Sequence, residues 1–149
     1  MSIENLIYQI LSLNNNKKID IYELNILLLL IEKEYFLKTN KRLTNFKYTL
    51  YKKENIEKIF KIINKNYMLQ LEYKFLHNKT LITYIKLKNT YINKKRIKNK
   101  NLILKYLDKS FEYKYKEYSK YINKLNILEL NSRIEMNKTD IIELINSII

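Results

Sequence analysis

Apolar residues recur at helical spacing in the first thirteen positions and then fill one segment completely. In residues 2–13 they follow the i, i+3, i+4, i+7 pattern, which predicts an amphipathic helix. Residues 20–38 contain the run Ile26–Ile31 (ILLLLI), which is apolar on every face of a helix. Such a helix must be covered on several sides, and it is shorter than the roughly 20 apolar residues that span a bilayer. We therefore expect a buried central helix, capped by Asp20 and ending near Asn40.

The next part of the chain predicts one helix and one β-hairpin. Isoleucine and phenylalanine at helical spacing predict a helix over residues 54–64. In residues 67–75 apolar and polar side chains alternate, which is the period of a half-buried strand, and residues 81–88 form the returning strand after a polar turn at 77–79. The side of the first strand expected to be half-buried consists of Tyr67, Leu69, Leu71, Tyr73 and Phe75.

The C-terminal part, residues 101–149, predicts three more helices. The first covers residues 102–107, the second is capped by Ser110, and the third starts at Asn137 and contains the apolar stretch Thr139–Ile149. This part holds eight basic and seven acidic residues. Because it is nearly neutral, we expect it to pack or to pair with another chain, and a homo-oligomer formed through these helices is one such arrangement.

The elements together indicate an α+β fold that is mostly helical, with about six helices and one β-hairpin. The order helix, helix, helix, hairpin is typical of a winged helix, in which the third helix enters the major groove of DNA and the hairpin lies along the backbone. We expect a single domain over residues 1–149. It would comprise a winged-helix-like core at 2–88, which overlaps a basic region at 41–100, and a C-terminal helical part at 101–149.

The composition determines how turns form and which chemistry is available. The 149 residues include no Gly, Pro, Cys or Trp, and lysine outnumbers arginine 26 to 3; this bias points to an AT-rich genome, such as that of a virus or mobile element. Turns must then use Asn, which tolerates the left-handed backbone region. Disulfides and thiolate metal sites are excluded. The first residues do not have the pattern of a signal peptide, so we expect a cytoplasmic protein (in the host cell if viral) with no membrane insertion.

The net charge of +14 is confined to the middle of the chain. Residues 41–100 hold seventeen basic and three acidic residues, a net charge of +14, whereas residues 1–40 and 101–149 carry −1 and +1. A codon bias toward lysine acts on the whole chain and does not explain this localisation. A confined positive charge indicates an anionic partner, such as nucleic acid or an acidic protein.

Lysine contacts neutralise phosphates and give salt-dependent, weakly sequence-specific affinity. Base readout in the third helix would fall to Asn55, the only Asn or Gln early in that helix. The candidate nucleic-acid-binding residues are Lys52, Lys53, Asn55, Lys58, Lys61, Lys65, Lys74, Lys79, Lys86, Lys88, Lys94, Lys95, Arg96 and Lys98.

The sequence offers no candidate catalytic or metal-binding residue. His77 is the only histidine, and both general acid–base catalysis and metal binding usually need partner groups. Phosphate-cradling loops need glycine. We interpret the carboxylates of Glu32, Glu34, Glu54 and Glu57 as parts of solvated helix faces, and expect a protein that is not an enzyme and uses no cofactor.

The segment 20–64 resembles the N-terminal half of the Panacea (SocA-like) domain, in which a leucine-rich helix ending in an aromatic residue precedes a short turn and a second aromatic step. The Gly-Pro that follows in the family is replaced here by Tyr51–Lys53. The resemblance implies a non-enzymatic protein-binding module, such as an antitoxin or an adaptor that delivers a client for degradation. The matching residues are Leu27–Ile31, Tyr35, Arg42–Thr44 and Phe46–Tyr48.

Two hypotheses follow from the sequence. The first is a nucleic-acid-binding protein, for DNA or for structured RNA and ribonucleoprotein, that uses the basic region 41–100. The alternative is a small inhibitor or antitoxin-type adaptor whose basic face binds an acidic protein.

Overall fold

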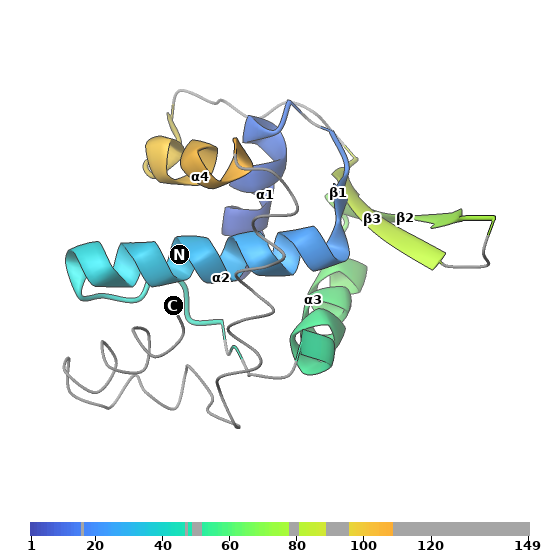
Figure 1. The fold of residues 1–149 in the computed structure, drawn as a ribbon, viewed down its shortest axis with the longest axis horizontal. Helices are drawn as coiled ribbons and strands as arrows, with labels where there is room; N and C mark the ends of the chain where they lie inside the picture. The colour runs from blue at the N-terminus through green and yellow to red at the C-terminus, as the bar shows by residue number, and fades with distance from the viewer. Residues whose placement is uncertain (16, 47, 49–51, 78–80, 89–95, 109–149) are drawn as a thin grey trace.

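The computed structural model describes residues 1–15, 17–46, 48, 52–77, 81–88 and 96–108 (Figure 1). Within these residues the protein is a mixed α+β structure with four helices and three strands. The predicted helices after Ser110 and from Asn137, and with them the oligomer predicted through Thr139–Ile149, lie outside the described residues. The elements are α1 (Ile3–Leu13), β1 (Ile19–Asp20), α2 (Ile21–Thr39), α3 (Lys52–Lys65), β2 (Leu69–Phe75), β3 (Leu81–Leu87) and α4 (Lys100–Leu107).

Helix α2 is the buried central helix that the sequence predicts. The side-chain carboxylate of Asp20 accepts a hydrogen bond from the Tyr22 amide at 2.6 Å, and Asn40 ends the helix in the left-handed conformation with φ 57°. Helices α1 and α4 lie over one side of α2 and α3 lies on the other (Figure 1), which explains why the helix is apolar all round. No helix in the described part of the chain is long and apolar enough to cross a membrane.

Left-handed backbone conformations in the described residues occur at Asn15 and Asn40, with φ of 56° and 57°. Asparagine thus takes the place that glycine usually has in such turns. This confirms the expectation drawn from a chain without glycine.

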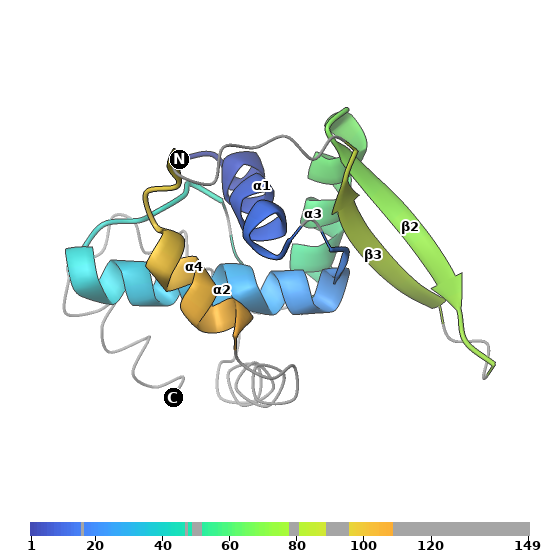
Figure 2. The same ribbon diagram turned by 90° about the horizontal axis from the view of Figure 1, so that it is seen from above.

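The three strands form an antiparallel sheet in the order β1-β3-β2. The hairpin β2–β3 is confirmed, while β1, which has only two residues, was not predicted. The expected burial of β2 is partly wrong: Leu69 is buried, but Tyr67, Tyr73 and Phe75 are exposed. For Tyr73 and Phe75 the reason is visible in Figure 2, where the outer half of the hairpin projects beyond the helices, whereas Tyr67 precedes β2 at the base of the hairpin.

A single cluster of buried apolar side chains joins the elements from α1 to α4. Leu69 of β2 and Ile85 of β3 belong to it, as do Ile103 and Tyr106 of α4. The first predicted C-terminal helix therefore packs into the same core as the helices and the hairpin before it.

Two carboxylates that the sequence assigned to a solvated face of α2 are in fact buried, which corrects that interpretation. Glu32 has no exposed surface and binds Arg42 and the backbone of the loop after α2. Glu34 accepts hydrogen bonds from Lys105 of α4 at 2.9 Å and pairs with Lys38 at 2.8 Å. Both side chains fix neighbouring elements to α2.

Candidate functional site

Helix α3 presents lysines on the side opposite the core. Ile56, Ile59 and Ile63 face the core, and the exposed stripe at four-residue spacing reads Lys53, Glu57, Lys61 and Lys65. Residues four apart lie one above the other on a helix surface. Lys58 is half-buried beside this stripe, and Lys52 is the first residue of the helix. The stripe is therefore basic, with one negative charge in its middle.

The solvent face of the hairpin carries the second group of lysines. Lys86 of β3 and Lys18, which precedes β1, each lie 3.2 Å from the carboxylate of Glu72. Hydrogen bonds from Lys86 and Lys18 hold the pKa of Glu72 below its usual value. Two ammonium groups therefore flank one carboxylate, and the patch keeps a net positive charge. Lys74 is exposed farther out on β2.

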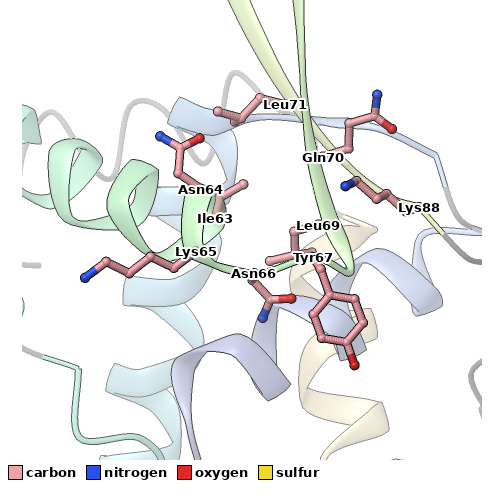
Figure 3. Close-up of a pocket in the computed structure, with 9 residues that line it drawn as sticks. All are labelled: Ile63, Asn64, Lys65, Asn66, Tyr67, Leu69, Gln70, Leu71 and Lys88. Carbon is pink, nitrogen blue, oxygen red and sulfur yellow. The ribbon is translucent and has the colours of Figure 1, made fainter.

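A hollow of about 430 Å³ lies where the C-terminal end of α3 meets the base of the hairpin (Figure 3). Lys65 and Lys88 are its two cationic lining residues, and in Figure 3 the Lys88 side chain points toward Gln70 while Lys65 points outward. Asn66 is held in place because its side-chain oxygen accepts hydrogen bonds from the Tyr8 hydroxyl and the Met68 amide. The lining consists of Ile63, Asn64, Lys65, Asn66, Tyr67, Leu69, Gln70, Leu71 and Lys88.

Two groups of lysines thus lie at the end of the molecule where α2 begins, and Lys65 and Lys88 line one hollow between them. We call the two groups together the α3–hairpin surface. Helix α3 and strand β2 contact each other, and the hollow connects the stripe on α3 to the hairpin. The surface comprises Lys53, Lys58, Lys61 and Lys65 of α3 and Lys74, Lys86 and Lys88 of the hairpin.

Asn55 does not belong to this surface, which corrects the role expected for it. Its side chain is fully buried in α3, with no exposed area. A residue that faces the core cannot reach a base edge. Helical spacing could have indicated this, because Asn55 lies four residues before Ile59 and eight before Ile63, on the apolar side of α3.

Two further candidates lie elsewhere on the molecule. Lys98 lines a second hollow, of about 450 Å³, together with Tyr35, Lys38 and Thr39 at the C-terminal end of α2, and Arg96 is exposed close by in the chain. A helix of 19 residues is roughly 28 Å long, so these two cations are far from the α3–hairpin surface. Lys79, Lys94 and Lys95 lie outside the described residues.

One cation of the site was not among the sequence candidates. Lys18 is 54 positions away from Glu72 and joins the hairpin patch because β1 pairs with β3. Its ammonium group also lies 4.5 Å from the centre of the Tyr84 ring. No local pattern identifies such a residue, since its contacts depend on a two-residue strand.

The described residues contain no group of three or more His, Cys, Asp or Glu side chains that could hold a metal ion. His77 is exposed at the end of the hairpin, as the sequence predicted.

Comparisons with protein families, curated proteins and solved structures find no match for this chain. The resemblance to the Panacea domain therefore stays a prediction.

Proposed function

We propose that the protein is a non-enzymatic nucleic-acid-binding protein that uses the α3–hairpin surface. The observation that carries the proposal is that the fold brings two lysine-bearing segments of the basic region together, with Lys65 and Lys88 lining one hollow between them. Exposed ammonium groups spread over neighbouring elements suit the regularly spaced phosphates of a nucleic acid backbone.

The order of the elements supports a winged-helix arrangement for this binding. Three helices precede a hairpin, and the short strand between α1 and α2 pairs with β3 of that hairpin. In this arrangement α3 would lie in a groove and the hairpin would follow the backbone. The connection between α2 and α3 is unusually long for this arrangement. It comprises residues 40–51, whereas a helix-turn-helix uses a turn of about 3–4 residues.

The proposed binding is weakly sequence-specific. The surface consists mainly of lysines, which contact phosphates and carry no sequence information directly, and the buried Asn55 is not available to read a base. Duplex DNA and structured RNA, including RNA in a ribonucleoprotein, both present the required array of phosphates.

The test is fluorescence anisotropy with a labelled DNA duplex and a labelled RNA hairpin, at salt rising from about 50 to 200 mM. Affinity should fall steeply with salt. The absence of binding at the lowest salt, or affinity that does not change with salt, overturns the proposal.

Two double variants that remove the same charge test the location of the surface. Lys61→Gln/Lys65→Gln should weaken binding and reduce the slope of log affinity against log salt by about 2, because each lost phosphate contact contributes about 0.9. Arg96→Gln/Lys98→Gln should change binding much less, because these residues lie at the other end of α2. Equal effects of the two variants would contradict the assignment of the surface.

An acidic protein is the second partner that this charge would fit, in the manner of an inhibitor or antitoxin-type adaptor. Polyglutamate as a competitor separates the two partners. If it displaces the labelled duplex at an equal concentration of negative charge, the surface prefers carboxylates and the alternative holds.

A further inference from the structure

The outer half of the hairpin carries an uncovered apolar face. Phe75 is 73% exposed, Tyr73 is 55% exposed and Leu81 is 44% exposed. We call these three residues the outer hairpin face. Large contiguous patches of exposed apolar side chains mark binding surfaces, whereas apolar residues that are exposed singly are normal.

This face continues the buried face of the same hairpin. Leu71 pairs with Ile85, Tyr73 with Thr83, and Phe75 with Leu81, so these side chains lie on one side of the sheet. The inner pairs pack on the core and Thr83 is still buried, but the hairpin extends beyond the helices, and Tyr73, Phe75 and Leu81 are exposed (Figure 2). The aromatic rings at Tyr73 and Phe75 are therefore presented to solvent by a regular, hydrogen-bonded strand pair.

We propose that the outer hairpin face stacks on unpaired bases of a single-stranded nucleic acid. This inference rests on the proposed function and names its substrate class. Tyr73 and Phe75 are two residues apart on one strand, which places them about 6.6 Å apart along it. Successive bases in a helical strand are only about 3.4 Å apart, which is less than the separation of the two rings. The two rings therefore fit a strand whose bases are already unstacked, with one base on each ring. Stacking of this kind tolerates any base, because every base has a π-face.

The charge around the rings supports an anionic occupant rather than an uncharged protein surface. Residues 73–77 and 81–88 contain three lysines and no acidic residue. Lys74, Lys86 and Lys88 lie on the side of the hairpin opposite the rings, and their positive potential reaches both sides of the two-stranded hairpin over a Debye length of about 10 Å. The adjacent Glu72 is paired with Lys18 and Lys86.

A spectroscopic test uses the absence of tryptophan from the chain. The variant Phe75→Trp provides a single reporter on the outer hairpin face, and Leu37→Trp provides a matched reporter at an exposed position near the C-terminal end of α2. Titration with a short oligothymidylate should quench the reporter at position 75 and leave the one at position 37 unchanged. A duplex of equal length should quench position 75 much less.

A second variant separates stacking from apolar contact. Tyr73→Leu/Phe75→Leu removes both rings at exposed positions but keeps the face apolar. Stacking is worth about 1–3 kcal/mol per base, so affinity for the single strand should fall at least 10-fold, while affinity for duplex and the salt dependence stay near those of the wild type.

Failure of this inference differs from failure of the proposed function. If the wild type binds in a salt-dependent way but the position-75 reporter is not quenched, or the leucine variant binds the single strand as well as the wild type does, the stacking proposal is overturned and the basic surface remains. If the wild type binds neither single strand nor duplex at low salt, both proposals fail.

Discussion

The backbone amide and the side-chain hydroxyl of Thr44 both donate to the same carboxylate oxygen of Glu32, each at 3.2 Å. The other oxygen accepts hydrogen bonds from the Leu43 amide at 3.1 Å and from the Arg42 guanidinium. Because Arg42 also donates to the Phe46 carbonyl at 3.0 Å, one buried carboxylate folds the loop 42–46 back onto α2. Arg42 is thus a structural residue, although it lies within the basic region.

Replacing Glu32 with glutamine should lower the free energy of unfolding by about 2–4 kcal/mol, because an amide presents donors to a site made of donors and leaves a largely buried guanidinium without its charge partner. Urea unfolding measures this loss. In a double-mutant cycle, Glu32→Gln combined with Arg42→Gln should cost less than the sum of the two single variants. A loss below about 0.5 kcal/mol, the size expected of a surface substitution, would contradict this role.

Glu34 should make stability depend on pH in the acid range. Burial alone would raise its pKa, but hydrogen bonds from Lys38, Tyr106 and Lys105 outweigh this and lower it to about 2. A depressed folded-state pKa stabilises the protein above the unfolded value of 4.5, and this contribution disappears as the pH falls from 4.5 toward 2. Allowing for partial solvent screening, the contribution is about 1–3 kcal/mol.

The measurement for Glu34 is urea unfolding of the wild type and Glu34→Gln at several pH values. The two proteins should differ most above pH 4.5 and converge as the pH approaches 2. Lys105→Gln removes one partner and should move the acid transition to higher pH. A constant difference between wild type and Glu34→Gln across this range would show that the ion pairs do not set the pKa.

The elements that local patterns determine could be predicted from the sequence. Helix α2 has caps at Asp20 and Asn40 that are encoded within one or two turns, and the hairpin follows from alternation in β2 and from the β-favouring Ile, Thr and Tyr of β3. The basic surface could be predicted in part, because charge confined to residues 41–100 shows in the sequence whatever the fold.

The features that sequence reasoning missed depend on contacts between distant residues. The burial of Glu32 requires a loop without periodic pattern to fold back on α2, and the pairing of Lys18 with Glu72 requires the two-residue strand β1. Exposure of Tyr73 and Phe75 was missed for a different reason. Alternation fixes which side of a strand a residue faces, but the position of the helices decides where along the strand burial ends.

The core around α2 predicts a large difference between two leucines of the same helix. Leu28 has no exposed surface, whereas Leu37 is 43% exposed. Leu28→Ala should cost about 2–5 kcal/mol, since it removes buried contacts and leaves a cavity, and Leu37→Ala should stay within about 0.5 kcal/mol of the wild type. Thermal and urea unfolding of both variants give the comparison, and similar losses would show that α2 is not packed as described.

Glu57 provides a test in which binding is expected to improve. It lies in the exposed stripe of α3, four residues from both Lys53 and Lys61. Its negative charge would repel a phosphate group bound at that position. Glu57→Gln should strengthen nucleic acid binding about 2- to 5-fold at low salt and less at high salt, because screening weakens an exposed charge within a Debye length of about 10 Å. Asp108→Asn makes the same charge change at an exposed residue that ends α4 and should leave affinity nearly unchanged. Anisotropy titrations of both variants decide the matter: an equal gain for the two would mean that only net charge counts, and no gain for Glu57→Gln would remove the α3 stripe from the interface.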